Sequence, residues 1–291
     1  MPELPEVEVT RRAVAPKLVG RRIAEVRTTK PSYFFLTPPA RLKQALTGRS
    51  VVRLDRHGKY LVALLDDDTR LLLHLGMTGQ LFAAGARSVR LLSAERRSTL
   101  APDAQPAFRP DAHTHLALEF ADGPPALYFR DVRKFGKCAW LRRGETDARL
   151  DKLGTDALVA TGAELHAAAR RRSTPIKSLL LEQSVIAGIG NIYADEALFF
   201  AKIRPTRPAR RVTRAECDAL VRAARRVLER AIERGGSSID DFVRPDGSDG
   251  QYQRERKVYA REGEACSRCK TPIERIVIGQ RSAHFCPSCQ R

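Results

Sequence analysis

The first half of the chain places short apolar or alternating segments between turn residues, a pattern typical of β-strands. An amphipathic helix is predicted ahead of them, from about Glu6 to Leu18, because Gly20 follows it as a stop signal. Many short strands joined by Gly and Pro turns indicate a sandwich or barrel, which we expect to occupy residues 1–150. The predicted strands are Ser50–Leu54, Tyr60–Leu65, Leu71–Leu75, Leu116–Phe120, Ala126–Phe129 and Cys138–Leu141.

One stretch inside this half, Ala83–Ala112, has little periodicity and is rich in Arg, Ser, Ala and Pro. A segment of this length without a regular pattern predicts a mobile surface loop.

From about Asp156 the apolar spacing changes to that of helices. The last of these helices is strongly basic and ends at Gly235–Gly236, and the polar segment Ser237–Gln253 that follows predicts a loop and a candidate lid. We therefore expect a helical domain over residues 156–256 and a small module over residues 257–291. The predicted helices are Ala163–Arg171, Ile176–Gln183, Asn191–Ala201 and Arg214–Arg234.

The overall composition is that of a globular protein, but its charge is unusual. Of 291 residues, 43% are hydrophobic and 30% charged, which argues against a disordered chain. Lys and Arg number 52 against 34 for Asp and Glu, a formal net charge of +18. An Arg-rich composition from a GC-rich genome explains part of this excess. A nucleic-acid partner explains it better, because a charge this far from zero causes self-repulsion in the folded state, and a polyanion would offset it.

Four cysteines near the C-terminus form two CxxC pairs with sixteen residues between them, Cys266 with Cys269 and Cys286 with Cys289. This spacing predicts a closed four-thiolate site for one structural Zn²⁺ ion, and an iron–sulfur cluster is the minor alternative. The intervening segment Thr271–Phe285 alternates as a β-hairpin does. The site indicates a metal and leaves the activity open.

No signal peptide or membrane-length apolar run is evident, and the paired cysteines suit a reducing compartment. These features predict an intracellular protein with no membrane partner.

The chain begins Met-Pro-Glu, and loss of the initiator Met would leave Pro2 as a free secondary amine. An α-amino group has a pKa near about 7.7–8.0, against about 10.4 for lysine, so more of it is neutral and nucleophilic at pH 7. Attack on a sugar C1′ would give a cationic iminium that acidifies the C2′ proton and prepares β-elimination. Glu3 stands beside Pro2 as a possible proton donor or acceptor.

Six motifs follow one another along the chain: PELPEVE at Pro2–Glu8, RHGKY at Arg56–Tyr60, HLGMTG at His74–Gly79, DVRKFG at Asp131–Gly136, GIGNIYADE at Gly188–Glu196 and GQRSAHFC at Gly279–Cys286. In this order they make the chain resemble the formamidopyrimidine-DNA glycosylase (Fpg) family nearly from end to end. Val132 and Lys134 depart from the family's usual pattern without removing a functional atom.

The resemblance implies an α+β multidomain fold: an N-terminal catalytic β-sandwich with a leading helix, a helical domain with a helix-two-turns-helix, and a C-terminal β-hairpin zinc finger. It implies a bifunctional enzyme that removes 8-oxoguanine and formamidopyrimidines from duplex DNA through a Schiff base at the N-terminal proline. An AP lyase activity then nicks the strand by β,δ-elimination. We expect a monomer whose partner is damaged double-stranded DNA.

The implied roles fall on named positions. Pro2 matches the nucleophile, Glu3 its acid/base, Lys59 the lysine of β-elimination and Arg281 the arginine of δ-elimination. The implied phosphate contacts are His113, Arg133, Arg172 and Asn191, and the implied wedge that fills the gap left by an extruded nucleotide is Met77, Arg133 and Phe135.

Several of these residues also have ordinary structural explanations. Met77 and Phe135 are common core residues, Lys59 a common strand-end lysine, and His74 a hydrogen-bonding residue as readily as a site residue. We expect Asn191 both to cap its helix and to contact phosphate.

Two other functions compete. An enzyme resembling endonuclease VIII would use the same Pro–Glu chemistry on oxidised pyrimidines, but the PELPE start and the Met77, Arg133 and Phe135 wedge favour the purine-specific branch. A catalytically silent DNA-binding zinc protein would need none of Pro2, Glu3 and Lys59.

Overall fold

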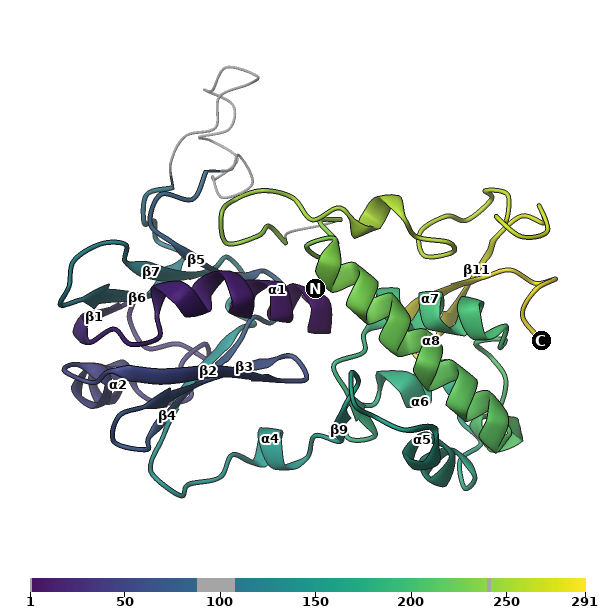
Figure 1. Cartoon of the computed structure of the whole chain (residues 1–291), viewed down its shortest axis with the longest axis horizontal. Helices are drawn as coiled ribbons and strands as arrows, with labels where there is room; N and C mark the ends of the chain where they lie inside the picture. The colour runs from purple at the N-terminus through teal and green to yellow at the C-terminus, as the bar shows by residue number, and fades with distance from the viewer. Residues whose placement is uncertain (1, 88–107, 240–241) are drawn as a thin grey trace, which may run out of the picture. The chain divides into compact units, whose positions relative to one another are not determined.

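The computed structural model of the chain describes residues 2–87, 108–239 and 242–291. It divides into two compact units (Figure 1). The first comprises residues 1–147 and 234–251, and the second comprises residues 148–233 and 252–291. Most of the segment predicted as a lid, Ser237–Gln253, thus returns to the first unit after the last long helix has ended.

The first unit is built on two four-stranded antiparallel sheets, with strand orders β1-β6-β7-β5 and β2-β3-β4-β8. Buried leucines and phenylalanines of both sheets, among them Leu61, Leu73, Leu118 and Phe129, form one hydrophobic core. This arrangement confirms the predicted β-sandwich. The strands are β1 Ile23–Thr28, β2 Val51–His57, β3 Tyr60–Leu65, β4 Arg70–His74, β5 Gly79–Ala83, β6 Thr114–Phe120, β7 Leu127–Asp131 and β8 Lys137–Leu141.

Two helices complete this core. Helix α1, Leu4–Val14, contacts β2, β3 and β5 and so touches both sheets, and a 3₁₀ turn, Ala15–Lys17, extends it (Figure 1). The observed helix begins at Leu4, two residues before the predicted start at about Glu6. Pro5 can occupy the first turn because a helix leaves the N–H groups there unpaired, so the missing N–H of proline costs nothing. Helix α2, Pro39–Leu46, contacts β1 and β8.

Residues 88–107, the centre of the predicted loop Ala83–Ala112, lie outside the described residues. The described ends of that stretch pack together, since Phe108 meets Phe82 edge-to-face with ring centroids 4.6 Å apart. Ala86 and Val243 join the same buried cluster. The segment after Gly236 is therefore packed against the base of the 83–112 stretch.

The second unit is helical. Helix α7 packs on α6, and the basic helix α8 packs on α5 and α7. Two residues of β9 pair with two of β10 in parallel. The elements are α4 Ala148–Asp151, β9 Thr155–Asp156, α5 Gly162–Ala169, α6 Ile176–Leu181, β10 Ile186–Ala187, α7 Asn191–Ala201, the 3₁₀ turn η3 Ala209–Arg211, α8 Arg214–Glu233, the 3₁₀ turn η4 Tyr252–Arg254, β11 Glu274–Ile278 and β12 Arg281–Phe285.

Two adjacent acids of α7 hold the C-terminal segment to the helices. Asp195 accepts hydrogen bonds from the backbone N–H and Nδ1 of His284 in β12, at 2.9 and 3.2 Å. Glu196 is fully buried and accepts three backbone N–H bonds from residues 257–259, at 2.8–2.9 Å. Strands β11 and β12 form the antiparallel hairpin that the alternation predicted.

Helices long and apolar enough to span a membrane are absent from the described part of the chain. The longest helix, α8, carries charged residues along its whole length.

Candidate active site

The N-terminus is buried at the start of α1. Pro2 is buried, and Glu3, 3% exposed, is the N-cap residue of the helix. The backbone N–H of Glu3 donates to Glu6 Oε2 at 2.8 Å, and Glu6 Oε1 accepts from the backbone N–H of Ser237 at 2.8 Å. Glu6 therefore fixes both the backbone that carries Pro2 and Glu3 and the beginning of the 237–253 segment.

Lys59 lies in the turn between β2 and β3 and is buried. Its position is tied to α1 through Arg56, which pairs with Glu8 at 3.1 Å and donates to the carbonyl oxygen of Gly58 at 2.9 Å. Burial alone would raise the pKa of Glu8, but hydrogen bonds from Arg11 and Arg12 and nearby guanidinium charges lower it to about 2. The ionised Glu8 thus links the helix of Pro2 to the turn of Lys59.

His74, at the end of β4, is neutral. Burial, assisted by the positive charges of Lys59 and Lys137, lowers the pKa of His74 to about 4. Its Nδ1 accepts from the backbone N–H of Gly76 at 3.1 Å, so the proton of the neutral ring is on Nε2. The Tyr60 ring packs on it with centroids 4.6 Å apart.

The three residues expected to form a wedge lie on two neighbouring loops of the first unit. Met77 is 38% exposed and Phe135 46% exposed, although both are large and apolar. Arg133 is exposed, and its guanidinium lies 5.4 Å from the centre of the Phe135 ring. The structure thus brings the three side chains out of the core, as a wedge requires.

His113 precedes β6, partly buried, in a turn held by Asp111. The Asp111 carboxylate accepts from the His113 backbone N–H at 3.0 Å and pairs with Arg130 at 2.9 Å. The His113 carbonyl accepts from the backbone N–H of Asp131, which places this turn beside the loop of Arg133.

Asn191, in the second unit, is not the helix cap that the sequence predicted. Gly190 holds the extended N-cap conformation and α7 begins at Asn191. The Asn191 amide instead donates to Ser282 Oγ in β12 at 3.2 Å. Gln183 braces the preceding turn by accepting from the N–H of Gly188 and donating to the carbonyl of Ile189, at 2.9 and 2.8 Å.

Arg172, the remaining expected phosphate contact, and Arg281, the expected arginine of δ-elimination, differ in their surroundings. Arg281 is exposed at the start of β12. Arg172 forms an ion pair with Glu182, both side chains being partly exposed. A phosphate contact at Arg172 would therefore compete with an internal carboxylate, which the sequence pattern did not indicate.

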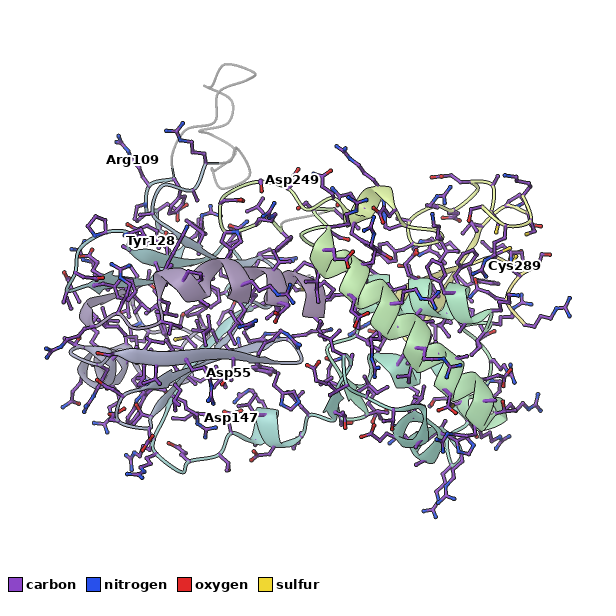
Figure 2. The ribbon with its side chains drawn as sticks, in the orientation of Figure 1. Asp55, Arg109, Tyr128, Asp147, Asp249 and Cys289 are labelled. Carbon is purple, nitrogen blue, oxygen red and sulfur yellow. The ribbon has the colours of Figure 1, made fainter. Side chains whose placement is uncertain are left out.

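The four cysteines converge in the second unit, and Figure 2 shows Cys289 in its C-terminal segment. Their sulfur atoms all lie within 4.8 Å of one another, and the separations of Cys266–Cys289 and Cys269–Cys286 are 3.9 and 3.4 Å. A tetrahedral site with Zn–S bonds of about 2.3 Å needs sulfurs about 3.8 Å apart, so the four thiolates fit one zinc ion.

The two CxxC turns have the same backbone hydrogen-bond pattern. The N–H groups of Lys270 and Gln290 donate to the carbonyls of Cys266 and Cys286, at 3.0 and 3.1 Å. With four protein thiolates the coordination is complete, which makes the zinc structural.

Sequence reasoning gave no role to several residues that hold these groups in place. Glu6, Asp131, Asp195 and Glu196 all lie inside the quoted motifs and are all buried. Their place inside the motifs was the signal available in the sequence. Their burial gives its physical reason, because a buried carboxylate needs partners.

Comparisons with known proteins agree along the whole chain. The family model of the formamidopyrimidine-DNA glycosylase N-terminal domain matches residues 1–138, and that of the formamidopyrimidine-DNA glycosylase H2TH domain matches residues 153–243. A zinc finger found in FPG and IleRS matches residues 263–291.

Full-length relatives and solved structures give the same result. Formamidopyrimidine-DNA glycosylases of Cupriavidus pinatubonensis and Janthinobacterium sp. are 44% and 42% identical, each alignment covering 100% of both chains. A Lactococcus lactis FPG variant, solved with DNA containing Fapy-dG, is 35% identical with a TM-score of 0.83 and covers 100% of both chains. The MutM (FPG) protein of Thermus thermophilus is 37% identical with a TM-score of 0.80, covering 99% of this chain and 98% of that one. By motifs, by domain order and by fold, this chain belongs to the formamidopyrimidine-DNA glycosylase family.

Proposed function

We propose that this chain removes 8-oxoguanine and formamidopyrimidines from duplex DNA and then nicks the strand, with Pro2 as the nucleophile. The observation that carries the proposal is the buried Pro2–Glu3 start of α1, held by Glu6 through hydrogen bonds of 2.8 Å. A protein that only bound DNA would have no use for an amine and a carboxylate fixed side by side.

In the first step the neutral amine of Pro2 attacks the sugar C1′. The bond between C1′ and the damaged base breaks, the base leaves with the bonding electron pair, and a proton must reach the sugar ring or the base. Glu3 is the adjacent group able to deliver that proton. The product is an iminium ion between Pro2 and the opened sugar.

In the second step the iminium draws electrons from C2′, whose proton is removed while the 3′ phosphate leaves. We assign assistance at this β-elimination to Lys59, which the ion pair of Glu8 and Arg56 ties to α1. We assign δ-elimination, in which the 5′ phosphate leaves, to Arg281.

The remaining candidates serve substrate binding. Met77, Arg133 and Phe135 fill the space of the extruded nucleotide, because an enzyme cannot reach C1′ inside a stacked duplex. His113, Arg133, Arg172 and Asn191 bind phosphates. The zinc ion, held by the four cysteines, folds the hairpin that carries Arg281.

We also infer that a catalytic domain over residues 1–150, a helical domain over 156–256 and a zinc finger over 257–291 act together as a monomer on damaged double-stranded DNA. Its place of action is the cytoplasm, at the nucleoid. The net charge of +18 supports a polyanionic partner.

Borohydride trapping tests the nucleophile. Reduction of the iminium should join the protein covalently to a duplex that carries 8-oxoguanine, and mass spectrometry should find the DNA on the N-terminal peptide. Acetylation of the N-terminus should abolish the adduct. An adduct on Lys59 would refute the assignment of Pro2.

Glu3→Gln is the matched variant, since it keeps the shape of the side chain but cannot deliver the proton. It should lower 8-oxoguanine excision by roughly 10²–10⁴-fold, the usual contribution of a general acid, and still trap on an abasic duplex. A duplex with thymine glycol separates the endonuclease VIII-like alternative: stronger cleavage there than at 8-oxoguanine would reverse the substrate assignment.

A further inference from the structure

We propose that Asp131 and Thr78 are positioning residues that join the loop of Met77 to the loop of Arg133 and Phe135, so that the wedge acts as one rigid body. The proposal rests on the proposed function, because it concerns the step in which the wedge replaces an extruded nucleotide.

Asp131 is the last residue of β7 and is completely buried. One carboxylate oxygen, Oδ1, accepts a hydrogen bond from the Thr78 hydroxyl. The other, Oδ2, accepts from the backbone N–H of Gly136 at 2.6 Å. One carboxylate therefore closes the loop from 131 to 136 on itself and ties it to the residue after Met77.

The Thr78 hydroxyl is used in both directions. It donates to Asp131 and accepts from the backbone N–H of Arg133 at 3.2 Å. A hydroxyl group has one proton to donate, and that proton is committed to the carboxylate. The orientation of the group is thus fixed, and with it the backbone on both sides of the wedge.

The two loops also touch without any side chain between them. Gly76 has φ +65°, and a Cβ there would lie 2.4 Å from the backbone N of Gly136 and from the carbonyl carbon of Phe135. Only glycine permits this approach. A shift of one loop must therefore displace the other.

Three further residues support these two loops from outside. His115 Nε2 lies 2.9 Å from the carbonyl oxygen of Asp131, and Thr29 Oγ1 lies 2.9 Å from His115 Nδ1. Since a carbonyl can only accept, Nε2 carries the proton and Thr29 donates to Nδ1. The hydroxyl of Tyr33, a residue 57% exposed, donates to the carbonyl of Arg133.

This frame explains how large apolar groups stay exposed at fixed positions. Folding Met77 and Phe135 back onto the protein surface would remove apolar area from water and lower the free energy. The buried carboxylate of Asp131 prevents their loops from doing so. A rigid plug matters most when a stacked base must leave the duplex. It matters less at an abasic nucleotide, which has no base to unstack.

A merely structural role of Asp131 and Thr78 predicts equal losses on every substrate, whereas a positioning role predicts a change in the ratio of two activities. Thr78→Val removes the hydroxyl and keeps the shape of the side chain. Thr78→Ser restores the hydroxyl. The matched control is Thr37→Val, because Thr37 donates to the carbonyl of Trp140 and accepts from its N–H, at 3.2 and 2.9 Å, away from the wedge.

Three quantities are measured for each variant: single-turnover excision of 8-oxoguanine, nicking of an abasic duplex, and the fluorescence of 2-aminopurine beside the lesion. Thr78→Val should slow excision and the fluorescence rise by roughly 10- to 100-fold, while abasic nicking changes by less than about three-fold. Thr78→Ser should return excision to within about three-fold of wild type, and Thr37→Val should match wild type on both substrates.

Equal losses on the two substrates in Thr78→Val, or an unchanged ratio, would overturn the proposal. Tyr33→Phe extends the test if Thr78→Val does not fold, because it removes only a half-exposed hydroxyl; it should slow excision alone, by about three-fold. An unchanged ratio in that variant would overturn the proposal as well. Wild-type protein that excises no 8-oxoguanine would refute the proposed function itself, a result distinct from an active wild type with an unaltered ratio.

Discussion

At the scale of single residues, His74 makes stability depend on pH. Its pKa is about 4 in the folded chain, against 6.5 for the free side chain. Between these values the unfolded chain binds a proton that the folded chain refuses, so stability rises with pH through this window and is constant above it. We expect acidification from pH 6.5 to 4 to cost roughly 1–3 kcal/mol through this residue.

The comparison with His74→Asn isolates this effect. The Asn side-chain oxygen can still accept from the Gly76 N–H, as Nδ1 does in the wild type at 3.1 Å, but it does not titrate. Urea unfolding at intervals between pH 4 and 8 should show that the wild type loses more stability than His74→Asn as the pH falls. Curves that stay parallel over this range would show that His74 titrates alike in both states.

The identities of the site residues were accessible from the sequence because they lie in motifs, but their partners were not. Glu6 receives the N–H of Ser237, which is 231 positions further along the chain. Arg172 pairs with Glu182, and nothing in the local sequence distinguishes this arginine from Arg170 and Arg171 beside it. Long-range pairings of this kind depend on the fold, and no spacing rule reports them.

At the scale of elements, the contact of α6 with α7 rests on a buried ion pair. Lys177 Nζ lies 2.6 Å from Asp195 Oδ1, and both side chains are fully buried. Lys177 also donates to the carbonyl of Ser282, and Asp195 accepts from His284, so the pair holds β12 to both helices. Asp195→Ala would leave a buried ammonium uncompensated, and we expect it to cost about 3–5 kcal/mol in the free energy of unfolding.

The double variant Lys177→Met with Asp195→Leu provides the control. Removing both charges avoids the isolated ammonium, so its stability should exceed that of Asp195→Ala and approach that of the wild type. Guanidinium unfolding followed by the fluorescence of a probe on the second unit measures all three. A double variant as unstable as Asp195→Ala would place the loss in the His284 hydrogen bonds instead.

The bounds of a strand were predicted most exactly where half-buried and buried positions alternate. Strand β3 alternates between half-buried and buried positions, and its predicted and observed bounds coincide. Strand β5 is buried along its whole length and has no alternation, so it was not among the predicted strands. Strand β1 is interrupted by a register shift near Glu25, which disturbs the period of two.

At the scale of the whole molecule, the charge of +18 should make DNA binding steeply dependent on salt. Each phosphate neutralised contributes about −0.9 to the slope of log K against log salt. The structure distinguishes Arg172, which we assign to a phosphate contact, from Arg281, whose role in δ-elimination brings it to the departing 5′ phosphate. Arg281 is exposed, whereas Arg172 is already paired with Glu182.

Replacing each of these two arginines should therefore change the slope of log K against log salt by a different amount. Arg281→Gln should flatten it by about 0.9, the value for one full contact. Arg172→Gln should flatten it by less, because breaking the pair with Glu182 offsets part of any phosphate contact. Glu182→Gln should strengthen binding, since it frees the guanidinium. Titration of a fluorescent duplex between 50 and 300 mM salt, about the range in which such contacts are measurable, gives all three slopes.

An unchanged slope in Arg281→Gln would remove Arg281 from the phosphate contacts. Weaker binding by Glu182→Gln would show that the pair orders the turn before α6 rather than competing with DNA.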